Sequence, residues 1–216
     1  MSSLDPRGYP QDFPRNYPMQ KIILASQSAV RQQLLQNAGV SFIAENARID
    51  ESLLKTSLLA EGAPPRDLVD QLAEAKAAKL ARKNPDAVVI GCDQILEFEG
   101  NILSKPDSLE EARAQLTMLR GKSHKLMSAA VIYHEAQPIW RHIGVVRLFM
   151  AEFSDSYLDA YLARNWPDIA QAVGAYMLES EGIRLFSRVE GSYFDVLGLP
   201  LTEVLNFLAL RGFIER

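Results

Sequence analysis

The chain has 216 residues, of which 48% are hydrophobic, with a formal net charge of −4 and a pI of about 5.5. This length and apolar content allow one substantial core and argue against a string of domains. The acidic balance argues against a nucleic-acid binder, because such proteins normally carry a basic surface. A single cysteine excludes an internal disulfide. Because we find neither a secretory pattern nor an apolar run of ~18 residues, we expect no membrane span and a cytoplasmic location.

Residues 1–20 hold Pro6, Pro10, Pro14 and Pro18, so neither helix nor strand periodicity can be maintained there. We interpret this segment as a flexible N-terminal extension. An alternative is that its aromatic residues dock on a partner surface. The remaining residues, 21–216, are predicted to form a single domain.

The first half of the chain alternates extended and helical patterns. Lys21–Ala25 is predicted to be a strand, and Ala29–Ala38 has apolar residues at helical spacing. Ser41–Ile49 is predicted to be extended and to lead into Asp50 and Glu51, followed by a polar connection. Pro65–Lys83, rich in Ala, Leu, Lys and Glu, is the clearest helix.

The most informative segment is the unbroken apolar run Ala87–Cys92, which is followed by Asp93. Such a run is typical of a strand buried on both faces, and a charge at its end lies where open sheets place their ligands. A compact hairpin that ends in Lys105 and Pro106 is expected next.

The second half mixes helices with long extended runs, beginning with a capping box at Ser108 and Glu111 that predicts a helix to about Leu119. The other predicted elements are an antiparallel hairpin over 125–133 and 139–149, a helix capped by Ser154 through Ala163, a strand region over 182–190 and a helix over 201–211. The fold class is therefore α/β, with a mixed, partly antiparallel sheet flanked by helices and two lobes around a central cleft.

A candidate anion site follows the first strand, where Ser26, Ser28 and Arg31 surround the start of a helix. The free N–H groups and positive dipole end of a helix favour an anion there. The alternative is that one serine is only an N-cap and that Arg31 is a solvated first-turn residue.

Lys76 lies on the apolar stripe of the predicted helix Pro65–Lys83, four residues from both Leu72 and Leu80. A lysine in that position is expected to have a partner, although it could instead extend its ammonium group to the surface. Lys79 and Lys83 are expected to be ordinary solvated charges.

Glu51, Asp93 and Lys105 complete a set of charges at the ends of extended segments. Carboxylates that converge at strand ends can hold Mg²⁺ or Mn²⁺, with Arg31, Lys76 and Lys105 offsetting the charge of a polyphosphate. Each residue could instead be a surface ion, and for Asp50 we prefer that interpretation. The three histidines lack the spacing of metal ligands, and Cys92 is expected to be a core residue.

Six separated segments carry a resemblance to a known family: Ile23–Arg31, Asp50–Ser52, Leu72–Ala77, Ile90–Gln94, Leu103–Pro106, and Gly191–Tyr193 with Gly198–Pro200. In order and approximate spacing they resemble the Maf family of nucleoside triphosphate pyrophosphatases, from about residue 21 to the C-terminus. The resemblance implies hydrolysis between the α and β phosphates, a divalent metal such as Mg²⁺ or Mn²⁺, and a homodimer.

The resemblance also implies roles for individual residues. Asp93 would act as general base or metal ligand on the attacking water, and Glu51 as a metal ligand. Lys76, Lys105 and Arg31 would be electrostatic clamps on the phosphates. The serines of the first segment, Ser26 and Ser28, would bind substrate beside Arg31.

The departures from the family pattern concern the first segment and the base. Ala29 and Val30 replace a proline and an arginine of the usual first segment. Gln94 and Glu179 resemble the 7-methyl-GTP branch, and a carboxylate at position 179 can accept hydrogen bonds from a guanine edge. Val30, however, stands where that branch has tryptophan. The altered first segment leaves open an alternative, a non-catalytic nucleotide-binding regulator of cell division.

Overall fold

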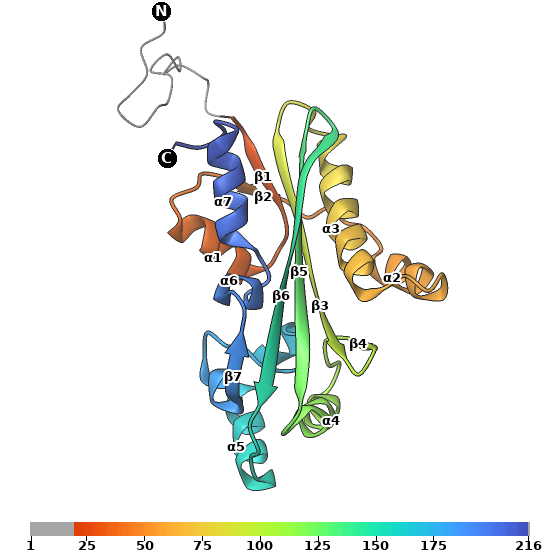
Figure 1. The fold of residues 1–216 in the computed structure, drawn as a ribbon, viewed down its shortest axis with the longest axis vertical. Coiled ribbons are helices and arrows are strands. Elements are labelled where there is room, and N and C mark those ends of the chain that lie inside the picture. Colours follow the sequence, from red (N-terminus) through yellow and green to blue (C-terminus); the bar gives the residue numbers. More distant parts are fainter. Residues whose placement is uncertain (1–19, 216) are drawn as a thin grey trace, which may run out of the picture.

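The computed structural model describes residues 20–215, so the predicted extension lies outside the described residues except for Gln20. Its architecture is a seven-stranded mixed sheet with helices on both faces (Figure 1). The predicted α/β class with a mixed sheet is confirmed. No helix among the described residues is long and apolar enough to cross a bilayer.

The strands are β1 (Ile22–Ala25), β2 (Ile43–Ala44), β3 (Val88–Phe98), β4 (Asn101–Leu103), β5 (Ser123–His134), β6 (Gln137–Met150) and β7 (Phe186–Glu190). The sheet order is β2-β1-β3-β5-β6-β7, with β4 also paired to β3. β1 runs parallel to β2 and β3, and the other pairings are antiparallel. The helices are α1 (Ala29–Asn37), α2 (Glu51–Ala60), α3 (Pro65–Ala81), α4 (Leu109–Leu119), α5 (Asp155–Asn165), α6 (Tyr193–Val196) and α7 (Leu201–Leu210), with 3₁₀ turns at Asp168–Gln171 and Glu181–Leu185.

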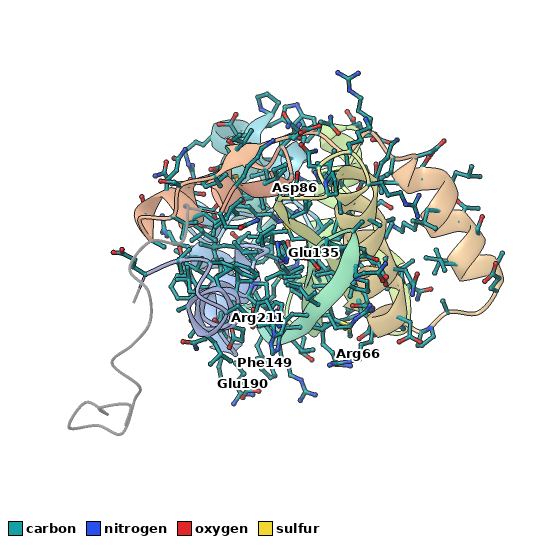
Figure 2. All side chains as sticks on the ribbon, turned by 90° about the horizontal axis from the view of Figure 1, so that it is seen from above. Arg66, Asp86, Glu135, Phe149, Glu190 and Arg211 are labelled. Atoms are coloured by element: carbon teal, nitrogen blue, oxygen red, sulfur yellow. The ribbon has the colours of Figure 1, made fainter. Side chains whose placement is uncertain are left out.

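Buried apolar side chains form three groups, of which two lie in an upper lobe of the domain and one in a lower lobe. In the upper lobe, one group packs α3 against one face of the sheet and a second packs α1 and α7 against the other face. The third group lies in the lower lobe with α4 and α5. Seen from above, side chains lie on both sides of the sheet (Figure 2). The long strands β3, β5 and β6 run through both lobes and join them.

Helix α3 packs unusually close to β3. A Cβ added at Gly91 would lie 2.2 Å from the carbonyl oxygen of Ala73 and 2.7 Å from the amide nitrogen of Ala77. Glycine at this strand position and alanines on the facing helix therefore let the two backbones approach. Lys76 lies between those two alanines in the sequence, so this contact brings its backbone close to β3.

Four predicted elements are wrong in part. The predicted strand region 182–190 begins only at Phe186, because Glu181–Leu185 forms a 3₁₀ turn. β3 does not end at Asp93 but continues to Phe98, because antiparallel pairing with β5 persists through Glu97. Of the predicted extended segment Ser41–Ile49, only Ile43 and Ala44 pair with β1. The expected polar connection after Glu51 is instead helix α2, which contains no fully buried residue and packs on the core through the partly buried Leu54 and Leu58, one helix turn apart.

The long β3 creates a gap at one of its edges. On the side away from β5, β1 pairs with β3 as far as Gly91 and β4 begins to pair at Leu96. Residues Cys92–Ile95 therefore have no neighbouring strand on that side, and we call this stretch the β3 gap. Asp93 lies within it, just beyond the carboxyl end of the parallel strand β1, where ligands of open sheets bind.

Candidate active site

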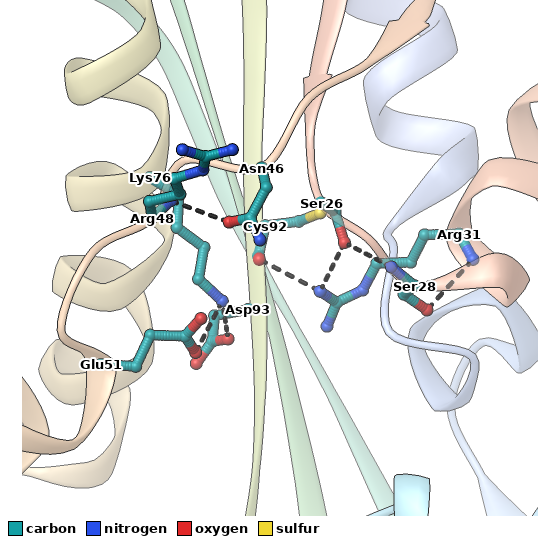
Figure 3. Close-up of polar contacts among 9 residues, drawn as sticks. All are labelled: Ser26, Ser28, Arg31, Asn46, Arg48, Glu51, Lys76, Cys92 and Asp93. Atoms are coloured by element: carbon teal, nitrogen blue, oxygen red, sulfur yellow. Dashed lines mark hydrogen bonds and ion pairs between the residues drawn. The ribbon is translucent and has the colours of Figure 1, made fainter.

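The centre of the site is a cluster of two carboxylates around one ammonium group (Figure 3). Lys76 Nζ lies 2.7 Å from Asp93 Oδ1 and 2.9 Å from Glu51 Oε2. Lys76 and Asp93 are buried, whereas the Glu51 side chain is 55% exposed. Burial lowers the pKa of Lys76, but Asp93 and Glu51 outweigh that effect, so the pKa is raised. Lys76 therefore stays charged. The sequence predicted a partner for it, and the structure provides two, Asp93 and Glu51.

Helix α2 begins at the site and presents Glu51 to it. Asp50 is the N-cap, and its Oδ1 accepts a hydrogen bond of 3.0 Å from the amide of Leu53. That bond and another from Ser52 lower the pKa of Asp50, so it is a capping residue outside the cluster. Glu51, the first helical residue, is thereby directed toward Lys76 of α3.

A second group of polar residues reaches β3 from the α1 side (Figure 3). Ser28 is the N-cap of α1, and its hydroxyl accepts a 3.5 Å hydrogen bond from the amide of Arg31. Arg31 Nη1 donates to Ser26 Oγ at 3.4 Å and to the carbonyl oxygen of Cys92 at 3.1 Å. Arg31 is therefore held at the β3 gap and is not a freely solvated first-turn residue, although the capping interpretation of Ser28 also holds.

Gln94 points to the sheet face opposite Asp93, because neighbouring strand residues alternate. Its Nε2 lies 3.0 Å from both Ser128 Oγ and the carbonyl oxygen of Asp195, and 2.9 Å from that of Val196. An amide nitrogen has two hydrogens, so these three acceptors share its donors. In this structure the Gln94 amide nitrogen ties α6 to the sheet.

Lys105 and Glu179 are exposed and are not joined to either group by contacts. Within residues 20–215, neither makes a hydrogen bond or ion pair. Lys105 follows β4 at the lower edge of the β3 gap, and Glu179 precedes the second 3₁₀ turn. The structure thus assembles Glu51, Lys76 and Asp93 by direct contact and places Arg31 beside them across β3. It leaves three predicted residues, Gln94, Lys105 and Glu179, without contact to either group.

The donor set can be tested against the expected divalent metal. No group of three or more His, Cys, Asp or Glu side chains suited to a metal occurs among the described residues. Mg²⁺, however, is commonly held by one or two carboxylates together with substrate phosphates. Glu51 and Asp93, which direct oxygens toward the same point at Lys76 Nζ, fit that incomplete kind of site.

Sequence reasoning did not single out Lys55, a half-buried residue of α2 whose Nζ donates to Ser104 Oγ at 2.9 Å. Its position four residues after Glu51 would have placed both on one helix face, had α2 been recognised. The contact itself joins residues 49 positions apart and has no local signal.

Comparisons with known proteins show which family the sequence resembles. A family profile described as Maf-like protein matches residues 21–211. A Ruegeria pomeroyi protein named nucleoside triphosphate pyrophosphatase is 59% identical over 90% of this chain and 98% of its own. A Brucella abortus protein named 7-methyl-GTP pyrophosphatase is 42% identical over 90% of this chain and 98% of its own. A solved dITP/XTP pyrophosphatase from Mycobacterium abscessus is 13% identical, with a TM-score of 0.44, over 91% of this chain and 98% of its own.

Proposed function

The chain belongs to the Maf-like protein family, and we propose that it hydrolyses nucleoside triphosphates to a monophosphate and pyrophosphate. The observation that carries this proposal is the Glu51–Lys76–Asp93 cluster, which lies at the β3 gap. Arg31 at the same gap supplies the cationic group that a phosphate requires. The relatives named nucleoside triphosphate pyrophosphatase support this function, since they match this chain over nearly their whole length.

In the proposed reaction, water attacks the α-phosphorus, and the bond from that phosphorus to the α,β-bridging oxygen breaks. Asp93, which lies 2.7 Å from Lys76 Nζ, accepts a proton from the attacking water. Arg31 and the serines of the α1 turn hold phosphate oxygens in place, which supplies much of the acceleration in phosphoryl transfer. Pyrophosphate leaves with the electrons of the broken bond.

We propose Mg²⁺ or Mn²⁺ as the cofactor, held by Glu51 and Asp93 together with substrate phosphates. Such an ion supplies charge neutralisation of the phosphates when bound. Lys105, exposed beside the β3 gap, would contribute a further positive charge. A cytoplasmic location and a homodimer also belong to the proposal as expectations from the family.

For the base, we propose guanine, with 7-methyl-GTP as the first substrate to test. The exposed carboxylate of Glu179 can accept from the N1–H and amino groups of a guanine edge, and it attracts the positive charge of the methylated base. The Brucella abortus relative named 7-methyl-GTP pyrophosphatase supports this choice. Gln94, with its nitrogen bound to α6, would act from the sheet face opposite Asp93.

The decisive experiment measures pyrophosphate release from 7-methyl-GTP, GTP, UTP and dTTP with Mg²⁺ or Mn²⁺. We expect Asp93→Asn to lower turnover of the best substrate by roughly 100-fold or more, because the proton acceptor is removed. Asp86→Asn, at an exposed position near the end of the sheet away from the site, is the matched control and should retain turnover. Near-normal turnover by Asp93→Asn would refute the assigned role. If the wild type binds nucleotides but releases no pyrophosphate, the result would favour the alternative function, a non-catalytic nucleotide-binding regulator.

A further inference from the structure

Lys55 is a cation of helix α2 that lies next to the cluster. It follows Glu51 by four residues, one helix turn, so both side chains lie on the same face of α2. Glu51 contacts Lys76, which contacts Asp93, and Lys55 extends from the same face to Ser104 Oγ at 2.9 Å. Lys55 therefore spans from α2 to the segment after β4 that leads to Lys105.

The ammonium group of Lys55 forms no ion pair within residues 20–215, and its hydrogen bond goes to a neutral hydroxyl. Burial lowers the pKa of Lys55, and the Asp93 carboxylate partly opposes that effect. A partly desolvated ammonium group without an ion pair is costly unless an anion approaches it. The residue is thus prepared for an anionic ligand at the site.

The distribution of charge along the gap indicates which part of a nucleotide this ligand is. The α1 side of β3 presents Arg31, whereas α2, α3 and the segment after β4 contribute Lys55, Lys76 and Lys105. Most of the charge of a triphosphate lies on its β and γ phosphates. Glu51 and Asp93 offset two of these three charges, and the divalent ion proposed for the two carboxylates would restore the cationic excess on that side. With the ion bound, that side suits the pyrophosphate portion, and the α1 side suits the remainder.

We infer that Lys55 binds the pyrophosphate portion of the nucleotide, exchanging the Ser104 hydroxyl for a phosphate oxygen. This inference rests on the proposed function, since it assigns a residue to the leaving group of that reaction. The bond to Ser104 has only one charged partner, whereas a bond to a phosphate oxygen joins two opposite charges, so the exchange adds an attraction that the hydroxyl does not supply. The bound pyrophosphate would also fix α2, which has no buried residue of its own.

The test measures binding of inorganic pyrophosphate with Mg²⁺ to the full chain by titration calorimetry. We expect Lys55→Ala to weaken this binding about tenfold while leaving the affinity for the nucleoside monophosphate unchanged, because the monophosphate lacks the contacted groups. Lys83→Ala, an exposed lysine beyond the end of α3, is the matched control and should bind pyrophosphate like the wild type. Lys55→Arg should retain most of the affinity.

Ser104→Ala separates ligand binding from a structural role. It removes the hydroxyl partner but keeps the ammonium group, so we expect unchanged or tighter pyrophosphate binding. An equal loss in Ser104→Ala and Lys55→Ala would overturn the inference, as would unchanged pyrophosphate affinity in Lys55→Ala or no pyrophosphate binding by the wild type. The measurement needs no turnover. A chain that binds pyrophosphate through Lys55 but releases none from triphosphates would refute only the proposed hydrolysis.

Discussion

At the scale of single residues, Lys76 forms ion pairs with both carboxylates of the cluster. Its Nζ lies within 2.9 Å of oxygens from Glu51 and Asp93, and it occupies the point toward which both are directed. A divalent ion held by the same oxygens would have to share this space with the ammonium group. Lys76 therefore has two opposing effects, since it offers a positive charge to the phosphates and also competes with a cation for the carboxylates.

This competition predicts a separation of metal binding from turnover in Lys76→Met. Without nucleotide, we expect tighter Mn²⁺ binding than in the wild type, measured as loss of the free-ion signal in electron paramagnetic resonance. Pyrophosphate release should nevertheless be largely lost, because the phosphates lose a cation. Lys83→Met is the control and should leave Mn²⁺ affinity unchanged. Weaker Mn²⁺ binding in Lys76→Met would show that the two carboxylates do not form the metal site.

Of the residues in the central cluster, Lys76 was predictable because a lysine on an apolar stripe of a long helix requires a partner. Asp93 was predictable from the apolar run before it. The pairing of Glu51 with Lys76 was not, because it depends on the turn that places α2 beside α3. The Gln94 contacts depend on α6, about 100 residues later in the chain, which no local pattern could reveal.

At the scale of elements, the contact between α3 and β3 positions the site. The nearest atoms to a Cβ at Gly91 belong to the backbone of Ala73 and the backbone of Ala77, so neither can move aside without moving the helix. Since Lys76 and Asp93 stand on these two elements, any separation of the elements lengthens the ion pair. The close packing at Gly91 therefore also sets the distance between Lys76 and Asp93.

We expect Gly91→Ala to lower the free energy of unfolding by about 1–3 kcal/mol through overpacking, measured by urea denaturation. Turnover per folded molecule should also fall, because α3 must shift away from Asp93. Gly39→Ala is the control: its φ of +72° makes alanine strained, but no atom lies within 4 Å of the added Cβ. That variant should lose stability and keep its turnover. Retained turnover in Gly91→Ala would mean that the close contact does not position Lys76.

The elements show where local patterns suffice and where they fail. Ser108 was correctly predicted as an N-cap, since its hydroxyl accepts from the amide of Glu111 at 3.1 Å. In a capping box the Glu111 side chain would accept a hydrogen bond from the amide of Ser108, whereas here it accepts one from the amide of Asp107. The end of β3 was mispredicted because a charge normally ends an apolar run, whereas here Lys76 neutralises Asp93 and pairing with β5 continues. Tertiary contacts thus overrode the local signal.

At the scale of the whole molecule, the sheet both builds the site and connects the lobes. β1 and β4 pair with the same edge of β3 but leave Cys92–Ile95 between them without a strand. The opposite edge of β3 is continuously paired with β5, which is in turn paired with β6. The gap is therefore an opening in an otherwise continuous scaffold, and the residues around it come from α1, α2, α3 and β3.

Two buried groups outside the site give the molecule opposite responses to pH. Burial lowers the pKa of His124 to about 4, so this group stabilises the fold above pH 6.5 and its contribution is lost as the pH falls toward 4. Burial, aided by Glu203 and opposed by His142, raises the pKa of Asp195 to about 6. For Asp195 the pH dependence of stability is reversed. Its contribution to the stability of the fold is full below pH 3.8 and is lost as the pH rises through about 6.

Replacing Asp195 by Asn should isolate one of these responses. Asp195 is 6% exposed, its Oδ1 has no hydrogen-bond partner among the described residues, and its carboxyl group lies directly over Gly144. Asn has the same shape and no charge, and it keeps the backbone carbonyl that binds Gln94. We therefore expect Asp195→Asn to be more stable than the wild type at pH 8.

The size of this gain should depend on pH, because at acidic pH the wild-type carboxyl is itself neutral in the folded state. Between pH 4.5 and pH 8 we expect the stability difference between Asp195→Asn and the wild type to grow by about 2 kcal/mol. Urea unfolding at both pH values measures it, and the His124 contribution cancels because both chains share it. Asp86→Asn, at an exposed position, should show no such growth. A difference that stays constant with pH would mean that Asp195 is ionised in the folded protein well below pH 6.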